Sequence, residues 1–487
     1  MHAVYKLIHY AINHTLIDEL DYDYVFNKLN TKLGLELKYV PYQKTAVKIS
    51  IDMILKDILD IAANKGLITP NTTQMRDLFE ADIMDIMTPL PAHLQASFEA
   101  LEKTSTKAAC DMFYNRSIHS NYIKMARIKK NDFYTVNSPY GTIDITINKS
   151  KPEKDPRDIA KQTKDTSYPK CLLCKENVGY YGHASHPGRS NHRAIKLQLN
   201  KEPFYLQFSP YVYYNEHIIV FHEAHIPMDI SKKTFIRLFD FVDRFPHYFL
   251  GSNAGLPIVG GSILSHEHYQ GGNATFPVDR ASSFYQTSHK GITIDLLNWP
   301  LSILKLQGND REALIDFAEN LRRYYKTYSN HDHNIIAKTN DTVHNAINPI
   351  VRKENNTYTV LIALRNNRTN ETYPDGIFHP HPNRHHIKKE NIGLIEVMGL
   401  AILPGRLETE FKQIKHALTH PNEAHDLGKH STWANTLKKQ NINTLDEIKQ
   451  EAGRVFIAGL EDCGVFKQDD QGRSAFKQFV KEFLAWV

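Results

Sequence analysis

The stretch at residues 260–272, Gly-Gly-Ser-Ile-Leu-Ser-His-Glu-His-Tyr-Gln-Gly-Gly, most narrows the structures that this chain can adopt. Glycines on both sides favour a backbone that takes positive φ or comes very close to a phosphate. If the piece is extended, His266, His268 and Gln270 project to one face, because side chains alternate along a strand. An imidazole, a neighbouring amide and open backbone N–H groups are components of phosphoryl chemistry. The alternative is a surface turn rich in glycine and histidine.

Composition and charge exclude several classes of protein. The 487 residues are enough for two or three domains, and 41% hydrophobic with 23% charged residues is ordinary for a soluble globular protein. A net charge of +5 favours neither a nucleic-acid partner nor a membrane surface. No segment approaches the roughly 18 apolar residues of a membrane helix, and the start of the chain lacks a signal-peptide pattern. We therefore expect a cytoplasmic protein with no membrane partner.

The first 130 residues have the apolar period of helices. Residues 51–62 repeat apolar side chains every three or four positions, and Gly66 is a plausible stop. Residues 70–73 form a turn and N-cap before a second amphipathic stretch at 75–87. We predict a helical N-terminal region over residues 1–130 with a structural role.

The remaining chain mixes strands and helices. Alternation predicts strands at residues 142–147, 204–220 and 358–364, a helix at 231–241, and a helical pattern at 392–403 that continues through the tail. The fold class predicted is α+β, with one half over residues 131–275 and a C-terminal half with a helical tail over residues 276–487.

Basic side chains occur at two places that are compatible with phosphate binding. Lys151 and Lys154 lie in a proline-kinked loop after the strand at 142–147, and Arg189 and Arg193 belong to the segment His-Pro-Gly-Arg-Ser-Asn-His-Arg. Arginine suits bidentate phosphate contacts. The more common interpretation of Lys151 and Lys154 is that they lie in a solvated loop and bind no phosphate.

Cysteine occurs only four times, which makes a secreted disulfide framework unlikely. Cys171 and Cys174 form a CxxC pair, whose thiolates can reach one tetrahedral zinc ion if two further ligands exist. Redox chemistry is the other use of CxxC, but no thioredoxin-like βαβ context surrounds it. A second histidine cluster at residues 379–386 is typical of a metal site, an anion site or a polar loop.

Five segments together resemble one family. They are CLLCKENVGYYG, HPGRSNHR, FSPYVYYNEH, GSNAGLPIVGGSILSHEHYQGG and PGRLE, and they occur in this order over nearly the whole chain. The combination is similar to galactose-1-phosphate uridylyltransferases, and more narrowly to their bacterial second class. The resemblance implies UMP exchange between UDP-glucose and galactose 1-phosphate by double displacement, in galactose metabolism. It also implies mostly antiparallel, histidine-triad-like sheets with flanking helices.

The resemblance assigns roles to residues of the central stretch. It implies that His268 is the nucleophile and that the Gln270 amide stabilises the covalent intermediate. Asn253 is expected at the nucleotide, and Gly261 and Ser262 are expected to contact phosphate. A neutral imidazole is a good nucleophile near neutral pH, and positioning and charge stabilisation carry most of a phosphoryl transfer.

The resemblance also supplies the ligands that the CxxC pair lacks. It implies a structural zinc held by Cys171, Cys174, His225 and His266, which would order the loop that carries His268. We expect no organic cofactor, because the protein itself carries the uridylyl group, and we expect a homodimer. Gly255 departs from the acidic residue of the second-class signature, and His379 and His381 match only part of the second metal site of first-class relatives.

Two other functions compete with this interpretation. A different histidine-triad nucleotidyl transferase or hydrolase, such as a dinucleoside polyphosphate phosphorylase, uses a similar nucleophile. A zinc module that binds nucleic acid would predict a basic face and salt-dependent affinity. The near balance of 59 basic and 54 acidic residues argues against the zinc module.

Overall fold

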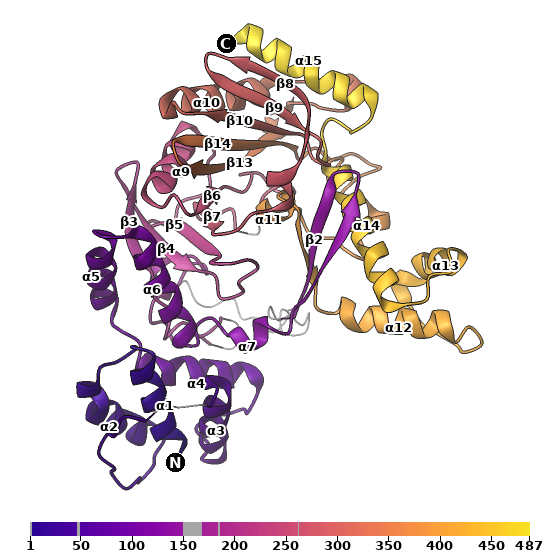
Figure 1. Ribbon diagram of the computed structural model, residues 1–487. Helices are drawn as coiled ribbons and strands as arrows, with labels where there is room; N and C mark the ends of the chain where they lie inside the picture. The colour runs from indigo at the N-terminus through magenta and orange to yellow at the C-terminus, as the bar shows by residue number, and fades with distance from the viewer. Residues whose placement is uncertain (1, 46–48, 150–167, 184–185, 262) are drawn as a thin grey trace.

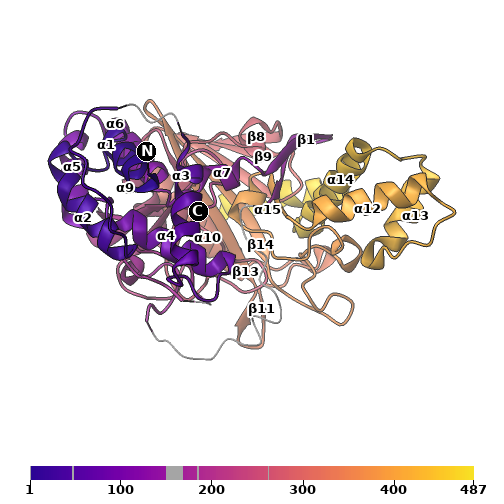
Figure 2. The same cartoon turned by 90° about the horizontal axis from the view of Figure 1, so that it is seen from below.

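The computed structural model describes residues 2–45, 49–149, 168–183, 186–261 and 263–487. A group of N-terminal helices lies at one end, a large β-sheet fills the middle, and C-terminal helices lie beside and above the sheet (Figure 1). Seen from below, the N-terminal helices lie at the opposite end of the molecule from α12 (Leu407–Thr419), α13 (Ser431–Lys439) and α14 (Leu445–Cys463) (Figure 2).

The N-terminal helices divide into two groups. The first four pack a hydrophobic core of their own: α1 (Ala3–Asn13), α2 (Tyr22–Lys32), α3 (Ile51–Asn64) and α4 (Thr73–Asp85). Thr72 caps α4 by accepting a hydrogen bond from the backbone N–H of Met75. The helices predicted around residues 51–62 and 75–87 are confirmed as α3 and α4. The helices α5 (Pro91–Glu102) and α6 (Thr106–His119) pack instead against the core of the large sheet, and the short α7 (Met125–Ile128) follows.

A ten-stranded sheet organises the rest of the chain, and every neighbouring pair in it is antiparallel. The predicted α+β class with mostly antiparallel sheet is confirmed. The sheet joins β6 (Phe249–Gly251) to β13 (Asn345–Glu354), so strands from both sides of residue 275 share it. In spatial order its strands are β3 (Ile195–Leu199), β4 (Glu202–Phe208), β5 (Ile218–His222), β7 (His268–Gly272), β6 (Phe249–Gly251), β13 (Asn345–Glu354), β14 (Thr357–Asn366), β10 (Ile303–Gly308), β9 (Ile292–Leu297) and β8 (Ser283–His289).

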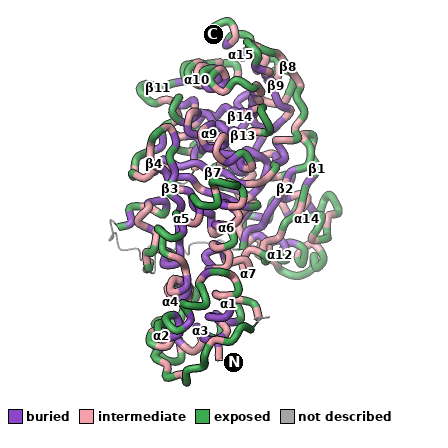
Figure 3. Tube along the Cα trace, turned by 60° about the vertical axis from the view of Figure 1, so that its left-hand side comes forward, coloured by how far each residue is buried: buried purple, intermediate pink, exposed green. Residues whose placement is uncertain are grey.

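Different elements cover the two faces of this sheet. The helices α9 (Lys232–Arg244), α10 (Arg311–Thr327) and α15 (Asp470–Trp486) contribute to the core on one face. Tyr269 belongs to that core, so its neighbours in β7 point to the other face. The other face packs against a small sheet and two helices: β1 (Asp132–Ser138), β2 (Gly141–Asn148), β15 (Leu400–Pro404), α11 (Leu394–Val397) and α14 (Leu445–Cys463). Figure 3 shows the buried residues concentrated along the strands.

The prediction of helix over residues 392–403 is wrong. The helix α11 has only four residues, and the chain then enters β15, which pairs in parallel with β2. Gly399 makes the change of direction: its φ is +98°, and a Cβ there would lie 2.8 Å from side-chain atoms of Pro277 and Trp299. The predicted helical tail is confirmed by α12 (Leu407–Thr419), α13 (Ser431–Lys439), α14 and α15. In the part of the chain that the structure describes, no helix combines the length and apolar character that crossing a membrane requires.

Candidate active site

His268 is the first residue of β7 and lies opposite Phe221 of β5. Its side chain is buried, and Nδ1 lies 2.8 Å from the backbone carbonyl oxygen of His266. A neutral imidazole that donates from Nδ1 to this carbonyl keeps its lone pair on Nε2. Burial lowers the pKa of His268 to about 4, while the hydrogen bond to His266 opposes that shift. The geometry therefore presents a neutral, oriented imidazole with its lone pair on Nε2.

Gln270 follows on the same face of β7 and is partly exposed. Its Cα lies opposite Ile219 of β5, which in turn lies opposite Gln207 of β4, so two amide side chains share one row of the sheet. His217 is buried beside this row; burial lowers its pKa to about 3, and interaction with Gln270 opposes the shift. Neutral polar groups thus line the sheet next to His268.

Asn253 and Gly261 meet in the structure. The buried Asn253 accepts a hydrogen bond at Oδ1 from the backbone N–H of Leu394, 2.9 Å away. Its Nδ2 lies 2.7 Å from the place that a Cβ on Gly261 would occupy, so a larger residue there would displace the amide. The amide of Asn253 is therefore held against the glycine loop that precedes His268.

Four predicted metal ligands converge although they are far apart in sequence. Cys171, Cys174, His225 and His266 each offer a ligand atom within 4.8 Å of the others. The two Sγ atoms are 3.6 Å apart, and Sγ–Nδ1 distances are 3.3 Å for Cys171–His266, 3.2 Å for Cys174–His225 and 3.7 Å for Cys174–His266.

These separations fit one tetrahedral metal ion. Zinc bonds of about 2.3 Å to sulfur and about 2.0 Å to nitrogen require separations of roughly 3.3–3.8 Å between ligand atoms. The Nε2 atom of His266 lies 2.8 Å from the carbonyl oxygen of His222, a contact that leaves Nδ1 for the metal. The residues present therefore suit a Cys₂His₂ site.

A buried ion pair between Glu267 and Arg237, which the sequence did not predict, holds the segment that carries His266 and His268. Glu267 is buried between the two histidines, and its Oε1 lies 3.0 Å from Nη1 of Arg237 on α9 and accepts from the hydroxyl of Tyr269 at 2.6 Å. Its Oε2 accepts from the backbone N–H of Asp229 at 3.0 Å. The alternation that turns His268 to one face turns Glu267 to the other, which is the only sign of this role in the sequence.

The other predicted phosphate ligands differ in their surroundings. All five N–H groups of Arg193 are used, by Asp85 and by the backbone carbonyls of Thr88, Pro89, Ser190 and His192. This arrangement anchors Arg193 to the N-terminal helices and leaves it no donor for a phosphate. Arg189 is buried, donates to the hydroxyl of Tyr122 at 2.7 Å, and has an unpaired Nε. Lys151, Lys154 and Ser262 lie outside the described residues.

The second histidine cluster does not assemble a metal site among the described residues. Nδ1 of His381 lies 3.3 Å from Oδ1 of Asp462, and Nδ1 of His379 lies 3.1 Å from the carbonyl oxygen of Pro380. Neither belongs to a described group of three or more converging metal ligands.

Comparison with known proteins places the chain among the nucleotidyltransferases. The family description "Galactose-1-phosphate uridyl transferase, N-terminal domain" matches residues 15–227, and the corresponding C-terminal domain matches residues 241–435. The chain belongs to the galactose-1-phosphate uridyl transferase family.

Curated relatives agree over almost the full length. The galactose-1-phosphate uridylyltransferase of Halalkalibacterium halodurans is 44% identical, with 97% of each chain covered. That of Bacillus subtilis is 45% identical over 99% of this chain and 97% of its own. Among solved structures, yeast Ap4A phosphorylase matches with a TM-score of 0.38 and 10% identity, covering 72% of this chain and 96% of that one.

Proposed function

We propose that this protein transfers UMP from UDP-glucose to galactose 1-phosphate through a covalent uridylyl-histidine at His268. The observation that carries the proposal is the hydrogen bond of 2.8 Å from Nδ1 of His268 to the carbonyl oxygen of His266. It leaves Nε2 as the attacking atom in a chain that belongs to the uridyl transferase family.

The reaction proceeds in two displacements. Nε2 of His268 attacks the α-phosphorus of UDP-glucose, the bond from that phosphorus to the bridging oxygen breaks, and glucose 1-phosphate leaves. Galactose 1-phosphate then attacks the same phosphorus with a phosphate oxygen, and Nε2 departs with its electron pair. The imidazole ring becomes positively charged while it carries UMP, and the Nδ1–H bond to the His266 carbonyl stabilises that charge.

The residues around His268 take roles that follow from their chemistry. Gln270 stabilises the uridylylated state with its amide, and Asn253 with Gly261 positions the nucleotide. Arg189 remains a candidate phosphate ligand because its Nε is unpaired. Lys151, Lys154 and Ser262 keep the phosphate roles that the sequence predicts.

Intact mass spectrometry tests this proposal with UDP-glucose as the only substrate. We expect the protein to gain one UMP, and we expect galactose 1-phosphate to remove it while UDP-galactose forms. Release of UMP into water without an adduct would instead indicate a nucleotidyl hydrolase. Absence of both adduct and turnover would refute the uridylyltransferase assignment.

We also propose that Cys171, Cys174, His225 and His266 hold a structural zinc ion that orders the segment carrying His268. We expect about one zinc per chain in protein purified without chelator, because Cys₂His₂ sites are closed and tetrahedral. Cys174→Ser removes a thiolate, so zinc content and the melting temperature should both fall. Elemental analysis and thermal unfolding measure these two effects; a Cys174→Ser protein with undiminished zinc would contradict the site.

Asn253 offers a separate test of nucleotide positioning. Gly261→Ala places a methyl group 2.7 Å from Nδ2 of Asn253 and displaces it. We expect KM for UDP-glucose to rise about tenfold, which corresponds to about 1.4 kcal/mol, while zinc content stays constant. Steady-state kinetics with unchanged KM and kcat would show that the amide does not bind substrate.

A further inference from the structure

A second group of metal ligands lies on the C-terminal helices. His416 is in the last turn of α12, and Glu423 and His425 are in the loop that follows. Their ligand atoms lie within 4.8 Å of one another, and Nε2 of His416 is 3.8 Å from Oε2 of Glu423. The rings of His416 and His425 are 5.4 Å apart and nearly perpendicular. Figure 1 shows α12 well apart from β7, so these residues are separate from the site around His268.

One hydrogen bond and one ring stack position the two imidazoles. Nε2 of His425 lies 2.8 Å from the backbone carbonyl oxygen of His420, so a neutral His425 that donates there keeps its lone pair on Nδ1. Metal-binding histidines commonly donate their other ring N–H to a carbonyl in this way. The ring of His420 stacks on that of His416 at 4.3 Å and holds it in place at the helix end.

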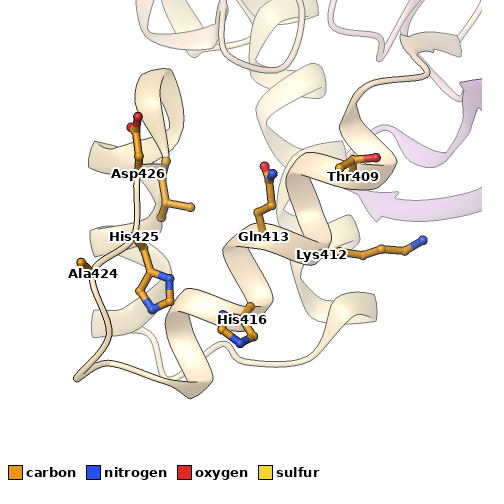
Figure 4. Close-up of a pocket in the computed structure, with 8 residues that line it drawn as sticks. Thr409, Lys412, Gln413, His416, Ala424, His425 and Asp426 are labelled. Carbon is orange, nitrogen blue, oxygen red and sulfur yellow. The ribbon is translucent and has the colours of Figure 1, made fainter.

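The end of α12 also favours a cation by its electrostatics. The last carbonyl groups of a helix carry a partial negative charge, and His416 lies among them. Glu423 adds a carboxylate. Nζ of Lys412, a residue that lines the adjoining cavity, lies 3.2 Å from Oε1 of Glu408, and Figure 4 shows its side chain pointing away from His416 and His425.

Room remains for an additional ligand beside these residues. A cavity of about 370 Å³ lies between α12 and the loop and is lined by Gln413, His416, His425 and Asp426, among others (Figure 4). Three protein ligands with an open fourth position form a common zinc geometry. Imidazole and carboxylate ligands suit divalent transition metals generally.

We propose that His416, Glu423 and His425 bind a divalent transition metal such as zinc and thereby clip the loop at residues 420–427 to the end of α12. The ligand atoms must approach to about 3.3 Å of one another, which small rotations of the exposed His416 and Glu423 and of the half-buried His425 achieve. Four ligand-atom separations in the Cys₂His₂ group are 3.2–3.7 Å, whereas His416 and Glu423 are 3.8 Å apart and exposed, so the clip should bind zinc more weakly and lose it on dialysis.

Zinc titration of the full-length protein after dialysis tests the clip. We expect wild type to take up about one further zinc per chain, and the double variant His416→Ala/His425→Ala to take up none. Glu423→Gln, which keeps the shape of the side chain, should weaken binding at least about tenfold. His93→Ala is the matched control, because His93 is also exposed but lies on α5.

Two outcomes would overturn the proposal. One is equal zinc uptake by wild type and the double variant. The other is an equal loss in His93→Ala, which would indicate scattered binding to exposed histidines. Tryptic cleavage after Lys429 provides a second readout, since zinc should slow it in wild type but not in the double variant. UMP transfer should be the same in both proteins, so failure of the clip is distinguishable from failure of the uridylyltransferase assignment.

Discussion

His268→Gly is expected to lower kcat for UMP exchange by at least about 10⁴-fold and to abolish the covalent adduct. The reason is that the substitution removes the proposed attacking atom, Nε2 of His268, which the 2.8 Å hydrogen bond from Nδ1 to the carbonyl of His266 orients. Loss of a nucleophile removes the covalent route itself, and what remains is the contribution of binding and charge stabilisation. Stopped-time assays of UDP-galactose formation and intact mass measure the two effects.

Control variants separate chemistry from folding in this experiment. His331→Ala removes an exposed histidine outside the site and should retain full activity. The circular dichroism of His268→Gly should match wild type, because one side chain at the start of β7 is removed and the strand keeps its backbone pairing. A UMP adduct that persists in His268→Gly would assign the nucleophile to another residue.

Arg237→Met is expected to destabilise the protein by about 3–5 kcal/mol, because it leaves the buried Glu267 carboxylate without its cation. Arg237 is buried too, and it also pairs with Glu202 and contacts the hydroxyl of Tyr269 at 3.0 Å. Urea and thermal unfolding measure the loss. Because Glu267 lies between His266 and His268, kcat should fall as well if His268 is the nucleophile proposed above, since small displacements of a reacting group are costly.

Lys233→Met is the matched control for this variant. Lys233 lies on the same helix and pairs with the same Glu202 at 3.2 Å, but its side chain is 63% exposed. Exposed ion pairs contribute about 0–1 kcal/mol, so Lys233→Met should be nearly neutral. Equal destabilisation by the two substitutions would show that burial of the Glu267 pair is not what matters.

The sequence alone determined most of the local elements and the family to which the chain belongs. Apolar period predicted the helices at residues 51–62 and 75–87, which the structure has as α3 and α4, and alternation predicted the strand at 358–364, which became β14. These patterns succeed because each reports which side of a single element is buried. The order of five segments also predicted the family, because such motifs preserve the residue types that the chemistry needs.

Only the tertiary structure decided which distant residues meet. Cys171 and His266 are 95 positions apart, yet their ligand atoms lie 3.3 Å from each other, because the CxxC segment folds beside the end of β7. Arg193 was predicted to bind phosphate, but Asp85 and four backbone carbonyls take all its donors.

Contacts between distant segments also explain why one element was predicted wrongly and why one ion pair was not predicted. Residues 400–404 have an apolar period compatible with a helix, but pairing with β2 makes them a strand. The structural role of Glu267 depends on its ion pair with Arg237, which lies on a different element, α9. Burial, pairing and counter-charges belong to contacts between segments, and a pattern within one segment does not contain them.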